Sequence, residues 1–192
     1  MKHFFAYLSR LNHIYRWSLM RNTFPENVAE HTAQVAFIAH GIATLGNVRY
    51  HREYDVGQIV QLALFHDAGE VLTGDLATPI KYQNEEIKAA YKQVERDASR
   101  RLIRMLPEDL RKAYEGLLTP DEGQAAWRIV KAADRISAYV KCMAEMKAGN
   151  AEFEKAAQRI LSSIRSAGLE EVRDFMTDFV PSFSLSLDEL ND

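Results

Sequence analysis

Apolar residues recur every three or four positions along most of this chain, and this period constrains its fold more than any other feature. Residues 27–46 illustrate it with Val28, Val35, Ile38 and Ile42, which would share one face of a helix. Runs that alternate apolar and polar residues, as half-buried strands do, are almost absent. We therefore expect an all-α fold. The predicted helices cover residues 27–46, 55–73, 84–107, 124–147, 151–167 and 169–180.

Residues that cap or break helices set the expected helix ends. Asn27 is expected to cap the first helix, because its side chain can accept a hydrogen bond from a free N–H group of the first turn. Gly46 and Gly74 are expected to end the first and second helices, and Gly168 the fifth. Pro107 restricts further propagation of the third helix.

The length and composition favour one globular domain over residues 1–192, because 47% hydrophobic residues are enough for a sizeable core. A net charge of −3 gives no overall attraction to a polyanion, so neither nucleic acid nor an anionic membrane is an expected partner. No apolar run approaches the roughly 18 residues of a membrane span. The single cysteine, Cys142, excludes an internal disulfide and fits a reducing compartment. These features predict a cytoplasmic protein.

Four side chains on three different predicted helices have the chemistry of metal ligands: His31, His66, Asp67 and Asp134. A helical bundle can bring such side chains together in its core. Asp134 is informative because a carboxylate in an apolar helical stretch is costly to bury without a partner. The mixture of imidazole and carboxylate suits an octahedral divalent ion such as Mn²⁺, Co²⁺ or Fe²⁺ better than zinc.

The His66-Asp67 pair is a weak signal by itself, since polar residues are common at helix ends. Neighbouring residues of a helix point about 100° apart, so these two could share an ion only near the helix end or if their side chains converge. Glu70 would lie on the same helix face as His66, where it could move protons or, alternatively, pair with a surface cation. His40 would point about 180° away from His31 and is expected to be structural or exposed. The remaining histidines, His3, His13 and His51, are expected at the surface.

The segments "EHT", "FHDAGEVLTGD" and "KAADRISAYVKC" resemble the signature of HD-domain metal-dependent phosphohydrolases. Together with "HFFAYLSRLNHIYRWSLMRN" and "FVPSFSLSLDEL", they are similar to the bacterial HD-domain 5′-deoxynucleotidase family over nearly the whole chain. The resemblance implies an HD-domain helical bundle and a homodimer. It also implies cobalt- or manganese-supported hydrolysis of 2′-deoxyribonucleoside 5′-monophosphates to deoxynucleoside and phosphate.

The resemblance also implies roles for individual residues. The metal ligands fall on His31, His66, Asp67 and Asp134, and the catalytic residues on Glu70 and Arg16. The implied substrate contacts are Arg16, Trp17, Asp67, Asp75, Leu76, Ala77, Thr78 and Asp134.

The chemistry of several of these residues fits the substrate contacts that the resemblance implies. Arg16 could make charge-assisted bonds to a phosphoryl group, and the bulk of Trp17 could exclude a ribose hydroxyl. Without the resemblance, a surface arginine and a core tryptophan are the alternatives. The family reads Asp-Leu-Pro-Thr-Pro in the loop at residues 74–82, whereas this chain has Ala77 at the first proline, which would loosen the loop. Lys81 is either a further phosphate contact or a solvated side chain.

Two other functions are compatible with the motifs. The chain could be an HD phosphohydrolase that acts on a different nucleotide, such as a signalling nucleotide or a diester. It could also be a catalytically inactive helical interaction module. The Arg16-Trp17 pair and the loop at 74–82 favour a nucleoside monophosphate, and the presence of all four ligand residues with Glu70 favours an active enzyme.

Overall fold

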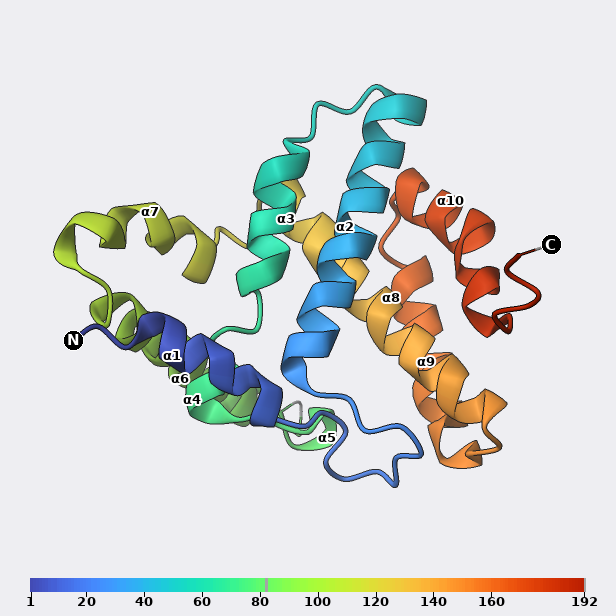
Figure 1. The fold of residues 1–192 in the computed structure, drawn as a ribbon, viewed down its shortest axis with the longest axis horizontal. Coiled ribbons are helices and arrows are strands. Elements are labelled where there is room, and N and C mark those ends of the chain that lie inside the picture. Colours follow the sequence, from blue (N-terminus) through green and yellow to red (C-terminus); the bar gives the residue numbers. More distant parts are fainter. Residues whose placement is uncertain (82, 192) are drawn as a thin grey trace.

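A computed structural model describes residues 1–81 and 83–191, and these residues form helices joined by short connections (Figure 1). In chain order the helices are α1 (Phe4–Leu8), η1 (Ser9–His13), α2 (Val28–Tyr50), α3 (Val56–Phe65), α4 (Glu70–Thr73), α5 (Thr78–Lys81), α6 (Glu85–Arg104), α7 (Glu108–Leu118), α8 (Ala125–Lys147), η2 (Ala151–Phe153), α9 (Glu154–Arg165), α10 (Glu170–Asp178) and η3 (Val180–Ser184). The prediction of an all-α fold is confirmed.

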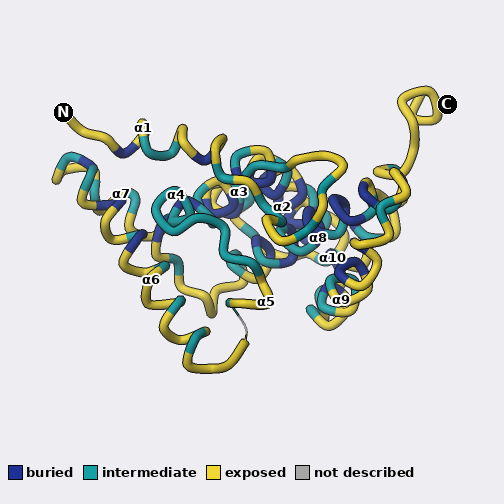
Figure 2. The backbone as a smooth tube through the Cα atoms, turned by 90° about the horizontal axis from the view of Figure 1, so that it is seen from below, coloured by how far each residue is buried: buried dark blue, intermediate teal, exposed yellow. Residues whose placement is uncertain are grey.

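The core lies where α2 meets α3, α8 and α10. Its centre includes Val35 and Ile42 of α2, Ile59 of α3 and Ile136 of α8, all without solvent exposure. Figure 2 shows the buried residues concentrated along α2, α3 and α8, whereas α6 and α7 are mostly exposed. Helices α2 and α8 are each 23 residues long. Each can therefore present polar site residues in one turn and apolar core residues in its other turns. Among the described residues, no helix combines the length and apolar character needed to cross a membrane.

Helix α2 begins as predicted and ends four residues later than predicted. Asn27 caps it, because its side-chain oxygen accepts from the Glu30 N–H at 3.0 Å while Glu30 accepts from the Asn27 N–H at 3.1 Å. The predicted stop at Gly46 is wrong. This glycine lies under the ring of Tyr54, where an added Cβ would come within 2.6 Å. The helix continues to Tyr50, and His51, with a left-handed backbone (φ 52°), caps its C-terminus.

The second predicted helix is interrupted at its functional end. Helix α3 stops at Phe65, residues 66–69 form a turn, and the helix resumes as the short α4. The cause is local: the His66 ring donates from Nδ1 to the Ala63 carbonyl oxygen at 2.7 Å, and Ala68 N–H bonds back to Phe65 at 3.1 Å, three residues earlier. The prediction of a continuous helix over residues 55–73 is therefore wrong. The turn, and not a regular helix, sets the directions of His66 and Glu70 relative to each other.

The other predicted helices agree with the structure, which also contains helical segments that the sequence patterns did not predict, among them α1 and η1. The predictions for α6, α8, α9 and α10 hold to within a few residues at each end. Helix α7, which follows Pro107 directly, is not predicted by the patterns used above. The loop expected over residues 74–82 is partly helical, because Thr78–Lys81 forms α5 with Pro79 in its first turn; Tyr82 lies outside the described residues.

The segment between η1 and α2 is fastened to α8 by one buried carboxylate. Glu145 is fully buried and accepts hydrogen bonds from the Thr23 N–H (2.9 Å) and Phe24 N–H (3.0 Å) groups. Lys141, one turn earlier on α8, bonds to both Glu145 and the Phe24 carbonyl oxygen. These bonds oppose burial and lower the pKa of Glu145 to about 2. The segment that carries Arg16 and Trp17 is therefore fixed against the helix that carries Asp134.

Replacement of Glu145 by alanine should destabilise the protein strongly. The change leaves the Lys141 ammonium and two backbone N–H groups buried without their partner, which typically costs about 3–5 kcal/mol. Urea unfolding followed by circular dichroism measures the loss. Arg21→Ala, which removes an ion pair from an arginine whose side chain is 93% exposed, serves as the control and should cost less than about 1 kcal/mol. Equal effects of the two variants would contradict this account of Glu145.

Candidate metal centre and adjoining cleft

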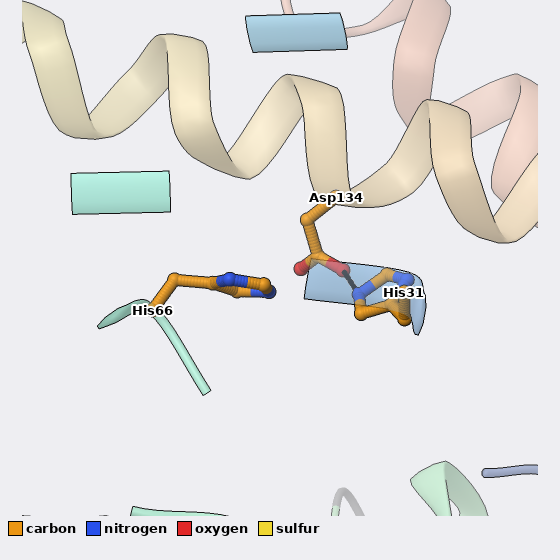
Figure 3. Close-up of side chains that lie close together, drawn as sticks. All are labelled: His31, His66 and Asp134. Atoms are coloured by element: carbon orange, nitrogen blue, oxygen red, sulfur yellow. Dashed lines mark hydrogen bonds and ion pairs between the residues drawn. The ribbon is translucent and has the colours of Figure 1, made fainter. Parts of the chain in front are cut away.

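Three potential metal ligands from separate parts of the chain lie close together in the structure. They are His31 of α2, His66 of the turn after α3 and Asp134 of α8, and one nitrogen or oxygen atom of each lies within 4.8 Å of the others. Figure 3 shows the two imidazoles directed toward the Asp134 carboxylate from opposite sides. The Nε2 atom of His31 is 3.2 Å from Asp134 Oδ1. The structure thus brings together three of the four side chains that the sequence singled out as candidate ligands.

Hydrogen bonds behind the two rings orient their Nε2 atoms toward this centre. The Ser137 hydroxyl donates to Gln34 Oε1 at 2.6 Å, so it accepts from His31 Nδ1 at 3.0 Å. The Ala63 carbonyl oxygen accepts from His66 Nδ1 at 2.7 Å. A neutral imidazole with its proton on Nδ1 presents a lone pair at Nε2, the arrangement that a metal ligand requires. Burial, followed by the charge of Arg16, lowers the pKa of His31 and favours this neutral form.

Asp67 lies against the same two rings. Its Oδ2 atom is 2.9 Å from His66 Nε2 and 3.7 Å from His31 Nε2. The same oxygen is 3.6 Å from Nη1 of Arg16. Asp67 does not belong to the three-residue group whose ligand atoms all lie within 4.8 Å. It connects that group to the arginine.

The centre has the features expected of a site for a divalent cation. Glu70 Oε2 is buried there without a hydrogen-bond partner, and His66 Nε2 faces Asp67 Oδ2 at 2.9 Å. Burial, followed by the charges of Asp67 and Asp75, raises the pKa of Glu70 to about 10. Burial by itself would also raise the pKa of Asp134, yet the charge of Lys131 holds it well below its usual range. Imidazole nitrogens, carboxylate oxygens and excess negative charge together fit a divalent metal ion.

A cleft of about 420 Å³ opens from this centre. Its walls come from the segment before α2, the residues between α4 and α5, and the facing sides of α8 and α9. All of the residues predicted to contact substrate line it. They are Arg16, Trp17, Asp67, Asp75, Leu76, Ala77, Thr78 and Asp134. Glu70 also faces the cleft, whereas His31 is fully buried behind it.

The other side chains considered in the sequence take structural positions. His3, His13, His40 and His51 are exposed, as predicted. The Thr73 hydroxyl donates to the Gly74 carbonyl oxygen at 2.9 Å. Lys81 lines the cleft and donates to Glu95 Oε1 at 2.6 Å, so neither of its expected roles is excluded.

Sequence patterns missed several residues of the cleft. Lys131 and Arg135 flank Asp134 on α8, and Arg159 faces them from α9. Lys131 donates to Asp134 Oδ2 at 2.5 Å. The position of Lys131 one turn before the candidate ligand Asp134 is a signal that could have identified it. Nothing local marks Arg159 or Ser137, because they reach the site only through the packing of α8 against α2 and α9.

Solved structures define the class to which this fold and site correspond. An HD-domain phosphohydrolase from Listeria innocua superposes with a TM-score of 0.83 at 25% identity, covering 94% of this chain and 88% of that one. A cyanophage S-2L HD phosphohydrolase, described as bound to dA and one catalytic Zn²⁺ ion, has the same fold with a TM-score of 0.65 at 22% identity, over 93% and 95% of the two chains. The helical arrangement is thus that of the HD-domain phosphohydrolases.

Sequence comparison narrows this class. The model of the YfbR-like 5′-deoxynucleotidases matches residues 3–183. A 5′-deoxynucleotidase of Pectobacterium atrosepticum is 50% identical over 193 residues, covering 98% of this chain and 96% of that protein. The chain belongs to the YfbR-like 5′-deoxynucleotidase family.

The raised pKa of Glu70 predicts how stability depends on pH in metal-free protein. A carboxyl with a raised pKa binds more protons in the native than in the unfolded state, so it lowers stability as pH rises from about 4.3 toward about 10. Glu70→Gln should therefore stabilise the chelator-treated protein, and the gain should grow as the pH rises above that lower limit. Urea unfolding from pH 4 to pH 9 measures the difference. A difference that does not grow with pH would contradict the electrostatics of this site, and Glu86→Gln on the exposed side of α6 provides the control.

Proposed function

We propose that this protein hydrolyses 2′-deoxyribonucleoside 5′-monophosphates to the deoxynucleoside and inorganic phosphate with the help of a divalent metal ion. The observation that carries the proposal is the position of the His/Asp centre at the end of a cleft that also presents Arg16 and Trp17. The names and the extent of the matching relatives support the same activity.

We further propose that His31, His66, Asp67 and Asp134 hold the ion. The approach of His66 Nε2 to Asp67 Oδ2 at 2.9 Å and the lone pair of His31 at Nε2 favour this assignment. Cobalt or manganese suits two imidazoles and two carboxylates better than zinc does, although a related fold is described with zinc. When bound, such an ion supplies Lewis-acid polarisation of the phosphate and a more acidic water.

The residues of the chain contribute positioning and proton transfer. Arg16, whose Nη1 is 3.6 Å from Asp67, can orient the phosphate oxygens with its guanidinium group. During hydrolysis a water oxygen bonds to phosphorus, the bond from phosphorus to O5′ breaks, and the leaving oxygen takes up a proton. Glu70 faces the cleft beside the His/Asp centre, so it is the group that can take up the proton released by the attacking water and pass it to the leaving oxygen.

The sugar is expected to lie beside Trp17. The Trp17 ring packs on Phe153 with centroids 5.3 Å apart, which fixes one wall of the cleft. A fixed wall near C2′ excludes a ribose hydroxyl by steric overlap. Asp75 and Thr78 also line the cleft and can exchange hydrogen bonds with the sugar and the phosphate. Leu76 and Ala77 would contact the substrate through their backbone and apolar groups.

A phosphate-release assay tests the proposed reaction. Chelator-treated protein should be inactive and should recover activity with Co²⁺ or Mn²⁺, with dAMP preferred over AMP by at least about tenfold. Nucleoside di- and triphosphates and cyclic nucleotides complete the panel. Equal rates on dAMP and AMP would refute the role of Trp17, and turnover restricted to a cyclic or polyphosphorylated nucleotide would refute the proposed substrate.

Substitution of Glu70 separates proton transfer from metal binding. Glu70→Ala should lower kcat by at least about 100-fold, while the protein still binds one equivalent of Co²⁺ in a titration followed by visible absorption. His66→Ala is the matched variant and should lose both activity and Co²⁺ binding, since it removes a proposed ligand. Near-normal phosphate release by Glu70→Ala would contradict the role given to Glu70.

We also propose that the protein is a homodimer and acts in the cytoplasm. Phe37 and Val48 are eleven residues apart on α2, and therefore on one side of it, with 80% and 71% of their surface exposed. A second copy of the chain could cover these apolar side chains. The free, buried thiol of Cys142 fits a reducing compartment. Light scattering of wild-type protein and of Phe37→Glu tests the dimer: a wild-type monomer would refute it.

A further inference from the structure

The backbone that carries Arg16 and Trp17 is tied to the start of α2. Arg16 N–H donates to the Glu26 carbonyl oxygen at 2.9 Å, and Val28 N–H donates to the Ile14 carbonyl oxygen at 2.9 Å. These bonds form an isolated antiparallel bridge between Tyr15 and Asn27. Two residues proposed to contact substrate are thus held against the turn that caps the helix of His31.

The side chain of Glu26 makes a second connection to the same two residues. A single oxygen, Oε2, accepts from Arg16 Nε at 3.0 Å and from Trp17 Nε1 at 3.1 Å. The side chains of Arg16 and Glu26 are only 12% and 13% exposed. Because Nε of Arg16 is occupied by Glu26, its Nη1 remains directed toward Asp67 and the metal centre.

Trp17 has a backbone conformation that requires such support. Its φ angle is 60°, in the left-handed region that bulky residues rarely adopt. Surrounding bonds must hold a residue in this conformation. The Trp17 carbonyl oxygen accepts from Met20 N–H at 2.9 Å and from Asn22 Nδ2 at 3.2 Å. The indole N–H is held by Glu26, so both ends of the residue are fixed.

We propose that Glu26 is a positioning residue that holds the phosphate-binding arginine and the sugar-facing tryptophan through one carboxylate oxygen. This inference rests on the proposed deoxynucleotidase function, because that function gives Arg16 and Trp17 their roles. Loss of Glu26 frees both side chains at once. Affinity for the phosphate and discrimination against ribose should therefore fall together, although Glu26 itself does not line the main cleft.

Two substitutions distinguish holding by hydrogen bonds from a general effect on folding. Glu26→Ala removes the acceptor, whereas the amide oxygen of Glu26→Gln can still accept from both N–H groups. We expect Glu26→Ala to raise KM for dAMP and to lower the ratio of kcat/KM for dAMP over AMP, each by about tenfold or more. Glu26→Gln should recover most of the dAMP/AMP ratio. Glu152→Gln, which alters an ion pair with Arg21 in the same segment, should leave both quantities unchanged.

A measurement without substrate separates this proposal from the function on which it rests. Trp17 and Trp127 are the two tryptophans of the chain, so in a Trp127→Phe background the emission reports on Trp17 alone. Acrylamide should quench this emission more strongly in Glu26→Ala than in Glu26→Gln or the parent. Unchanged quenching and an unchanged dAMP/AMP ratio in Glu26→Ala would overturn the proposal. A parent enzyme with no deoxynucleotidase activity would refute the function, and quenching would still show whether Glu26 holds Trp17.

Discussion

The burial of several acidic side chains beside two imidazoles is the constraint on which the rest of this structure depends. Asp67, Glu70 and Asp134 meet at one end of the core, and Asp75 lies close enough to raise the pKa of Glu70. Arg16 and Lys131 offset part of this charge. Burial of carboxylates without full compensation is unfavourable, and this supports the proposed divalent ion at the centre. The imidazoles with their Nε2 atoms turned inward are consistent with the same cation.

The backbone departs from regular helical geometry at two places beside this centre. The chain leaves α3 at His66, whose ring donates from Nδ1 to the Ala63 carbonyl oxygen and so turns Nε2 toward the centre. Trp17 adopts a left-handed backbone at the opposite wall. These departures cost conformational energy. Contacts distant in sequence offset it, and the bonds of Glu145 to Thr23 and Phe24 join residues more than 120 positions apart.

The sequence predicted the helices and most of the cleft because both depend on local patterns or on short motifs. The apolar period located α2 and α8, and the capping box began at Asn27 as predicted. The break after Phe65 could not be predicted, since Leu62 through Val71 continue an apolar period and the cause is one side-chain bond. The helix end predicted at Gly46 is wrong for a related reason. This glycine allows the close approach of the Tyr54 ring across a loop, and the preference of glycine for helix ends says nothing about such a contact.

Anomalous X-ray scattering from crystals grown with Co²⁺ tests the central claim most directly, because it locates the ion without reference to activity. The structure predicts one strong peak at the cobalt edge, in contact with the Nε2 atoms of His31 and His66 and with the Asp134 carboxylate. A peak at any other place, or no peak while the two imidazoles keep their present orientation, would contradict the assignment of this centre as a metal site.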